Sequence, residues 1–193
     1  MMKKRRMVKV YRFIAIKHFY NLAGYLLPIL AVFVLILGTY GSIGGLYLAP
    51  ADYQQGDAFR IIYVHVPSAF LSLFIYLVMA MAAVIGLIFR IKLADLIVSG
   101  SVFLGSWFTF LALLTGSVWA KPMWGAWWVW DARLTSELIL LFLYLGVIAL
   151  RSAIPEPRVA AKATAVLLML GLANIPIIHY SVYWWNTLHQ GAT

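Results

Sequence analysis

The chain contains no cysteine, and this absence excludes several kinds of site at once. No disulfide framework, thiolate metal centre or CxxC redox pair can form without it. Charge is also scarce, because only 11% of the 193 residues are charged and only 6 are acidic. Soluble domains carry about a quarter of their residues charged, so this composition argues against a soluble domain. The sequence also lacks a phosphate-binding loop of the GxxxxGK type, so any use of ATP depends on a partner protein.

Long apolar runs are what the sequence has in abundance. Apolar residues make up 64% of the chain, and the mean hydropathy is +0.92. A bilayer core about 30 Å thick needs about 20 mostly apolar residues per helix. Five runs meet this requirement, namely Leu22–Leu48, Ile62–Phe89, Leu96–Trp119, Leu134–Leu150 and Ala163–Tyr183. The sequence therefore predicts an all-α polytopic membrane protein with five transmembrane helices, forming a single integral membrane domain over residues 1–193.

The basic residues predict the orientation of these helices. Twelve of the 15 lysines and arginines lie before the first run, between the second and third, or between the fourth and fifth. The other connections hold only Arg60, Lys121 and Arg133. Because positive charge is enriched on the cytoplasmic side, we predict a cytoplasmic N-terminus with a basic leader over residues 1–20. Nucleic-acid binding is a poor explanation for a charge distributed in this way.

Tryptophan is concentrated at the opposite side. The segment WGAWWVWD, from Trp124 to Asp131, holds four of the 8 tryptophans, and only Trp107 lies inside an apolar run. The others at or beyond the same boundary are Trp119, Trp184 and Trp185. An aromatic belt would enrich both membrane interfaces, whereas a platform for a large, flat, apolar partner gathers indole rings on one side. We predict a periplasmic, tryptophan-rich loop over residues 120–133. From the residues alone, this loop is either part of an aromatic belt or a binding platform.

Two histidines flank this loop. His65 begins the second run and His189 follows the fifth, so both are predicted on the outer side. Neutral imidazole is a common ligand of iron, and two such groups can hold a porphyrin iron from opposite faces. Either histidine can instead be an amphipathic side chain at the interface. His179 is predicted to hydrogen-bond another helix, and His18 to face lipid headgroups or solvent.

The outer cations suit the two propionates of a haem. Arg60, Arg133 and Lys121 can pair with carboxylates, although simple snorkelling at the interface is the alternative. Asp131 can accept an indole N–H, pair with Arg133 or cap the fourth helix. Glu137 needs a partner near the start of that helix, and Arg133, four residues earlier, is a candidate.

Several segments together resemble the CcmC family, the haem-handling membrane component of bacterial cytochrome c maturation. They are APADYQQG, RIIYVHVP, GSVWAKPMWG, WGAWWVWDARLTSELILLFLYLG and PIIHYSVYWWNTLHQG. The tryptophan motif alone marks a broader superfamily of haem-handling proteins, but all five segments in this order are specific to CcmC. The resemblance extends from about Pro28 to Thr193. The family has a sixth span and a cytoplasmic tail beyond the segment that ends here, whereas five spans place this C-terminus outside.

The resemblance implies a function, a ligand and partners. Haem b would be held at the periplasmic face of the inner membrane, with iron bound axially by His65 and His189, and passed to the haem chaperone CcmE for covalent loading. The ABC transporter subunits CcmA and CcmB and the small membrane protein CcmD would assist. The other implied cofactor-binding residues are Trp124, Trp127, Trp128, Trp130, Asp131, Arg60 and Arg133.

Two other functions remain open from the residues alone. An electron-transfer cytochrome b would bury paired histidines within the helix bundle, and a cofactor-free transporter permease would place polar groups near the membrane midplane. No nucleophile–base pair is apparent in the sequence. We therefore predict no independent enzymatic activity, but the positioning of two reactants, which by itself accelerates a reaction.

Overall fold

The computed structural model describes residues 15–189, so most of the predicted basic leader lies outside the described residues. The described chain is helical, apart from connections that include one isolated bridge between Asp52 and Gly56. Five helical segments are long and apolar enough to cross a membrane, which confirms the predicted fold class. The elements are α2 (Ile16–Ile43), η1 (Gly44–Leu48), η2 (Asp57–Ile61), α3 (Ile62–Phe89), α4 (Lys92–Trp124), α5 (Ala132–Ala153), α6 (Pro157–Gly171) and α7 (Asn174–Trp184).

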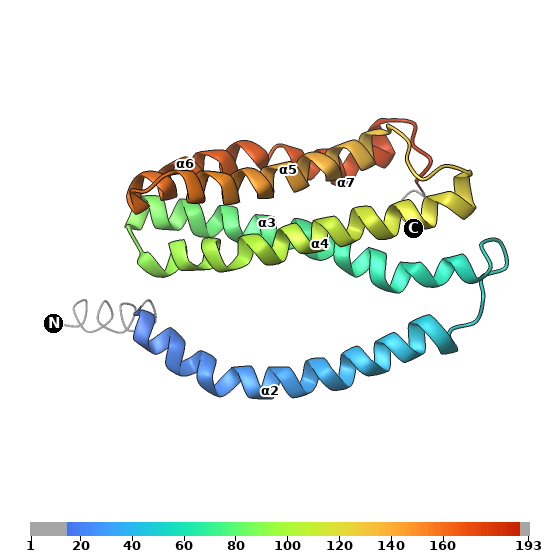
Figure 1. The fold of residues 1–193 in the computed structure, drawn as a ribbon, viewed down its shortest axis with the longest axis horizontal. Helices are drawn as coiled ribbons and strands as arrows, with labels where there is room; N and C mark the ends of the chain where they lie inside the picture. Colours follow the sequence, from blue (N-terminus) through green and yellow to red (C-terminus); the bar gives the residue numbers. More distant parts are fainter. Residues whose placement is uncertain (1–14, 190–193) are drawn as a thin grey trace.

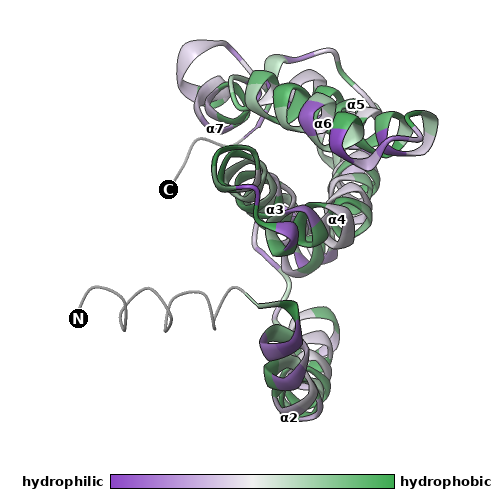
Figure 2. Cartoon of the chain, turned by 90° about the vertical axis from the view of Figure 1, so that its left-hand side faces the viewer, coloured by the Kyte–Doolittle hydropathy of each residue, from purple (hydrophilic) through white to green (hydrophobic). Residues whose placement is uncertain are grey.

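Helices α3 to α7 pack into a bundle, and α2 stands apart from it (Figures 1 and 2). No described residue of α2 is buried, and Pro28 lies within the helix. Local adjustment of the helix can compensate for the hydrogen bond that is lost at Pro28. The apolar surface of α2 is therefore suited to lipid, and α2 contributes nothing to the core of the bundle.

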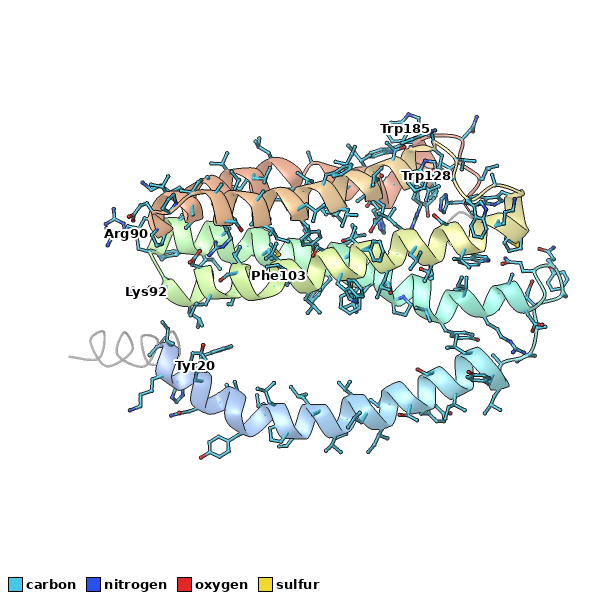
Figure 3. All side chains as sticks on the ribbon, viewed as in Figure 1. Tyr20, Arg90, Lys92, Phe103, Trp128 and Trp185 are labelled. Carbon is cyan, nitrogen blue, oxygen red and sulfur yellow. The ribbon has the colours of Figure 1, made fainter. Side chains whose placement is uncertain are left out.

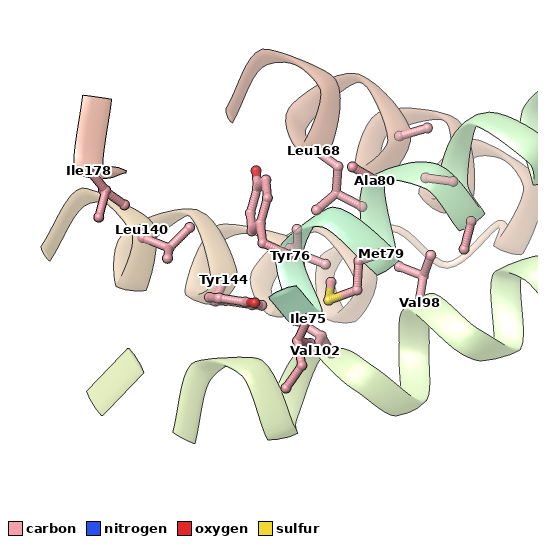
Figure 4. Packing of buried hydrophobic residues seen from close by; sticks show 14 residues of the cluster. Ile75, Tyr76, Met79, Ala80, Val98, Val102, Leu140, Tyr144, Leu168 and Ile178 are labelled. Atoms are coloured by element: carbon pink, nitrogen blue, oxygen red, sulfur yellow. The ribbon is translucent and has the colours of Figure 1, made fainter. Parts of the chain in front are cut away.

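Two tyrosines lie at the centre of the bundle (Figure 4). The rings of Tyr76 in α3 and Tyr144 in α5 meet edge to face, with centroids 5.4 Å apart. The Tyr144 hydroxyl donates a hydrogen bond of 2.7 Å to the Ser72 carbonyl oxygen. Glycines make room for both rings, since an added Cβ at Gly105 would overlap Tyr144 and one at Gly171 would overlap Tyr76. Small residues in α4 and α6 thus allow two large side chains to fill the core.

The two ends of the bundle differ in chemistry. Arg90 and Lys92 lie at one end, and Trp128 and Trp185 lie at the other (Figure 3). Near the basic end, Arg151 of α5 makes two hydrogen bonds of 2.9 and 3.3 Å to the Asp95 carboxylate of α4. The tryptophan-rich end is where the connections predicted to face outward come together. The side of the membrane to which each end belongs remains a prediction.

The fifth span is broken into α6 and α7, which the sequence pattern did not predict. Pro176 has no N–H for the Leu172 carbonyl, and its ring would clash with that carbonyl in a regular helix. The chain instead forms shorter-range bonds here, including Ile175 N–H to the Leu172 carbonyl at 3.2 Å. The Asn174 amide donates a hydrogen bond of 2.8 Å to the Ser136 carbonyl, which fixes the break against α5.

The tryptophan-rich loop is shorter than the predicted range 120–133. Helix α4 continues to Trp124 and ends at Gly125, whose φ of 75° is a left-handed conformation that glycine adopts without strain. Helix α5 begins at Ala132, directly after its N-cap Asp131. Only residues 125–131 are therefore irregular. The hydropathy pattern misplaced both boundaries because lysine, proline and tryptophan lower the apolar signal of a helix end without ending the helix.

Candidate haem-binding site

His65 projects from the first turn of α3 and is oriented by α4. Its Nδ1 lies 3.1 Å from the Thr115 hydroxyl oxygen. That hydroxyl lies 2.6 Å from the Leu111 carbonyl oxygen, which takes its only proton. Thr115 Oγ1 therefore accepts the Nδ1–H of His65. A neutral imidazole with its proton on Nδ1 leaves the lone pair of Nε2 free for a metal.

An aromatic contact and a glycine complete the surroundings of His65. The Trp119 ring meets the imidazole edge to face, with centroids 5.7 Å apart. Its indole N–H donates a hydrogen bond of 2.9 Å to the side-chain oxygen of Gln55. An added Cβ at Gly116 would lie 3.1 Å from His65 Cε1, so only glycine lets the ring lie against α4 without adjustment.

The connection before η2 is built to hold Gln55 in place. The Asp52 carboxylate accepts hydrogen bonds from the backbone N–H groups of Gln54 and Gln55, at 2.9 and 2.8 Å. Gly56 closes the turn with a φ of 58°. The sequence segment APADYQQG thus forms a compact turn that supports Trp119. This role was missed from the sequence, because nothing in a local pattern links Gln55 to a residue in α4.

His189 lies beyond α7 and is oriented by the N-cap of α5. Its Nδ1 is 2.9 Å from one carboxylate oxygen of Asp131, while the other oxygen accepts the Leu134 backbone N–H at 2.8 Å. Burial lowers the pKa of His189, and the hydrogen bond to the Asp131 carboxylate opposes that shift. A neutral ring beside an acceptor carries its proton on Nδ1, so Nε2 is again the free nitrogen. The Trp124 ring meets His189 edge to face at 5.0 Å.

The structure brings the two histidines and Arg133 into one electrostatic neighbourhood. His65 interacts electrostatically with both His189 and Arg133, and Arg133 also acts on His189. Within residues 15–189, Arg133 forms no ion pair. The candidate partner Arg133 acts electrostatically on Glu137, but the two do not come within ion-pair distance. Glu137 is buried and accepts a hydrogen bond of 2.8 Å from the Ser72 hydroxyl.

The other two outer cations hold parts of the chain together. Arg60 donates to the Leu46 carbonyl oxygen at 3.2 Å and pairs with Asp57 at 3.3 Å. Lys121 donates to the Gly125 carbonyl oxygen at 3.0 Å and lies 6.0 Å from the centre of the Trp127 ring. Both side chains therefore fix connections at the tryptophan-rich end, whether or not they also reach a ligand.

The tryptophans of the loop form a partly exposed aromatic surface. Trp127 is 57% exposed and Trp130 is 78% exposed, whereas Trp128 is half-buried, with its ring 5.4 Å from that of Trp130. Beside them is a shallow pocket of about 210 Å³. Its lining joins the loop to the segment before His189 and consists of Val129, Trp130, Asp131, Asn186, Thr187 and Leu188.

Four buried polar atoms have no hydrogen-bond partner in the described part of the chain, and two of them are N–H donors of residues at the tryptophan-rich end, Arg60 Nε and Trp128 Nε1. The other two are the hydroxyls of Tyr76 and Thr164, within the bundle. Arg133 has no anion within ion-pair distance in residues 15–189. Two Nε2 lone pairs face no protein donor in the same region. Hydrogen-bond donors, a cation, two metal-binding nitrogens and exposed indole rings together fit a flat apolar ring that carries a metal and carboxylates.

The remaining histidines take no part in this arrangement. His179 is exposed on α7, where its ring meets that of Tyr180 edge to face at 4.8 Å. Within residues 15–189 it makes no hydrogen bond to another helix, so that prediction is wrong. His18 lies near the start of α2, far along the chain from both His65 and His189.

Comparison with known proteins identifies the family. The family model described as CcmC, heme exporter protein C, matches residues 9–193. Heme exporter protein C of Escherichia coli K12 is 57% identical over 174 residues, which are 90% of this chain and 71% of that protein. The Haemophilus influenzae protein of the same name is 53% identical over 174 residues, with the same shares of 90% and 71%. A putative ccmC-like mitochondrial cytochrome c biosynthesis protein from Marchantia polymorpha is 47% identical over 158 residues, covering 82% of this chain and 65% of that relative. On the strength of these matches, the chain belongs to the CcmC family.

Proposed function

We propose that this protein binds haem at the periplasmic face of the bacterial inner membrane and presents it to the haem chaperone CcmE. The observation that carries the proposal is that two histidines have the same hydrogen-bonding arrangement. His65 and His189 each have Nδ1 held by a protein acceptor at about hydrogen-bond distance, 3.1 and 2.9 Å, so that each offers Nε2. Ligating histidines characteristically have the second nitrogen engaged in this way. Family membership supports a role in haem handling during cytochrome c maturation.

The cargo is haem b, an iron protoporphyrin that enters and leaves without covalent attachment to this chain. The iron would accept one nitrogen from each histidine. Arg133 would offset the charge of a propionate, aided by the unpartnered nitrogens of Arg60 and Trp128. Trp124, Trp127, Trp128, Trp130 and Asp131 would surround the ring and its ligand His189. The protein then contributes binding and orientation, while the bond-forming histidine belongs to the chaperone.

The same geometry favours assembly with the partners that the family implies. The exposed rings of Trp127 and Trp130 lie at the end of the bundle, where a periplasmic chaperone can approach. Helix α2, which is detached from the bundle and has no buried residue, offers a long apolar surface within the membrane. We propose that CcmA, CcmB and CcmD act together with this chain, and that ATP hydrolysis belongs to the transporter subunits.

The two alternative functions receive less support. A cytochrome b that moves electrons across the membrane needs haem sites at different depths, whereas His65 and His189 are together at one end of the described bundle. A cofactor-free permease needs polar groups that face a transport path. In residues 15–189, Glu137 bonds with the Ser72 hydroxyl and Tyr144 with the Ser72 backbone, and the hydroxyls without a partner, those of Tyr76 and Thr164, are buried within the bundle.

The axial assignment predicts a change of coordination in two variants. We expect detergent-purified protein to carry six-coordinate, low-spin haem, and His65→Ala or His189→Ala to yield a five-coordinate spectrum with lower haem content. The measurement is an absorption spectrum with a pyridine haemochrome assay, normalised to protein. His179→Ala is the matched control, because His179 is exposed on α7. Unchanged spectra in both site variants would show that other residues bind the iron.

The handover predicts a separate effect at the aromatic surface. Trp127→Ala removes a ring with about 1 kcal/mol of specific aromatic interaction, which corresponds to a several-fold loss in chaperone capture. The measurement is the yield of haem-loaded CcmE that co-purifies with the variant. Trp107→Ala is the matched control, since Trp107 is 59% exposed and Trp127 is 57% exposed. Equal yields from both variants would argue that the Trp127 ring does not meet the chaperone.

A further inference from the structure

The two candidate ligands differ in the group that holds them. The Nδ1–H of His65 donates to a neutral hydroxyl, that of Thr115. The Nδ1–H of His189 donates to a carboxylate, that of Asp131. The Thr115 oxygen is itself held by the Leu111 carbonyl at 2.6 Å, so it contributes only a lone pair and no negative charge. The two imidazoles thus have the same tautomer, but only that of His189 donates its hydrogen bond to a negatively charged acceptor.

This difference has a predictable effect on the bond from imidazole to iron. A hydrogen bond to an ionised acceptor is roughly twice as strong as one between neutral groups. By drawing the Nδ1 proton away, a carboxylate increases the electron density on Nε2 and strengthens its bond to a metal. A hydroxyl does so much less. In a haem held by both rings, the Nε2–iron bond of His189 would therefore be the stronger of the two.

The positions of the acceptors strengthen the contrast. Asp131 is anchored by its second oxygen, which accepts the Leu134 N–H at 2.8 Å and caps α5. The carboxylate therefore cannot turn away without uncapping a helix. His65, in comparison, is positioned by the Thr115 hydroxyl, by a backbone hydrogen bond at Ala112, by ring contact with Trp119 at 5.7 Å and by close packing on Gly116. The hydrogen-bond acceptors of His65 are therefore neutral, whereas the acceptor of His189 is a carboxylate.

We propose that His65 is the axial ligand displaced when haem leaves this protein, that His189 is retained until last, and that Thr115 is the positioning residue that sets this order. The proposal rests on the proposed function, because it assumes that both histidines bind the iron. The step is a ligand exchange. The bond between His65 Nε2 and iron breaks, a bond from an incoming donor forms, His65 keeps its Nδ1 proton, and no electron is transferred.

Carbon monoxide is a suitable probe for the exchange. The haem-loaded protein is reduced with dithionite and mixed with CO at increasing concentration. At saturation, the rate of CO adduct formation equals the rate at which the displaced histidine dissociates. We expect Thr115→Val to raise this limiting rate about tenfold, the size of effect seen when such supporting hydrogen bonds are removed. Thr115→Ser keeps the hydroxyl and is expected to resemble the parent.

The C–O stretching frequency identifies the ligand that remains. In His65→Ala the CO adduct has His189 opposite, and in His189→Ala it has His65 opposite. We expect the parent adduct to match His65→Ala and to differ from His189→Ala. A parent adduct that matches His189→Ala, or a limiting rate unchanged by Thr115→Val, would overturn the proposed order. Failure of the proposed function is distinguishable, because then the parent would show no six-coordinate haem before CO is added.

Discussion

Asp131→Asn is expected to abolish iron ligation by His189 while leaving α5 capped. In the parent, one Asp131 oxygen accepts the Leu134 N–H and the other accepts the Nδ1–H of His189, at 2.8 and 2.9 Å. Asparagine has a single oxygen, and asparagine caps helices as well as aspartate does. If that oxygen keeps the cap, the amide N–H₂ faces Nδ1. The imidazole must then carry its proton on Nε2, and that nitrogen can no longer bind iron.

The expected size of this effect follows from other proteins in which a histidine lost its supporting hydrogen bond or changed its tautomer. Losing a supporting partner costs about 10–100-fold in metal affinity, and an aspartate-to-asparagine change that reverses the tautomer of a catalytic histidine costs about 10⁴-fold in rate. We therefore expect a haem content at least tenfold below the parent at equal protein, and a five-coordinate spectrum in the fraction that binds haem. Thermal stability should remain near the parent value because the cap is retained.

A matched control separates the tautomer effect from a loss of negative charge. Asp52 lies at the same end of the bundle, and one of its oxygens accepts two backbone N–H groups. Asp52→Asn removes the same charge and retains an oxygen for those bonds, so haem content should be unchanged. Parent-like, six-coordinate haem in Asp131→Asn would mean that the iron does not depend on the Nδ1 hydrogen bond of His189.

Gly105→Ala is expected to destabilise the bundle by about 1–3 kcal/mol, the usual cost of overpacking a core. The added Cβ would overlap the Tyr144 ring and hydroxyl. Tyr144 has no room to retreat, since it is 0% exposed and packs edge to face on Tyr76. Its hydroxyl is also held by the Ser72 carbonyl at 2.7 Å. Helices α4 and α5 must therefore separate to accept one methyl group.

The measurement is the apparent Tm of detergent-purified protein, which is determined by fluorescence-detected size-exclusion chromatography after heating. Gly100→Ala is the matched control in the same helix, because an added Cβ there meets nothing within 4 Å. Alanine is favoured over glycine inside a helix by about 1 kcal/mol, so Gly100→Ala should leave the Tm unchanged or raise it. Equal Tm values for the two variants would contradict the close packing of Gly105 on Tyr144.

Much of the site was visible in the sequence as a set of residue types on one side of the membrane. His65, His189 and the tryptophans were singled out because apolar runs placed them at corresponding ends. The structure brings both histidines to the tryptophan-rich end and pairs each with a tryptophan ring, Trp119 and Trp124. Whether they bind haem is the proposal that the spectra test.

The supporting residues were not visible in the same way. From the sequence we assigned no role to Thr115, and Gln55 entered only as part of the segment APADYQQG. Asp131 had three possible roles, and the structure assigns it two at once, as helix cap and as acceptor for His189. Spacing along one helix suggested Arg133 as a partner for Glu137. Arg133 acts on it electrostatically, but the hydrogen-bond donor, Ser72, comes from α3.

The sequence by itself determined the number of membrane-spanning segments and the chemistry gathered at one end, because hydropathy and residue type are local properties. A run of apolar residues forms a helix in a bilayer whatever its neighbours are, since its backbone groups must bond within the segment. Only the tertiary structure decided which acceptor faces each histidine. His65 and Thr115 are 50 residues apart, and His189 and Asp131 are 58 apart. Contacts at such separations depend on how the helices pack, on glycines such as Gly105 and on the break before Pro176, which no periodic pattern along the chain records.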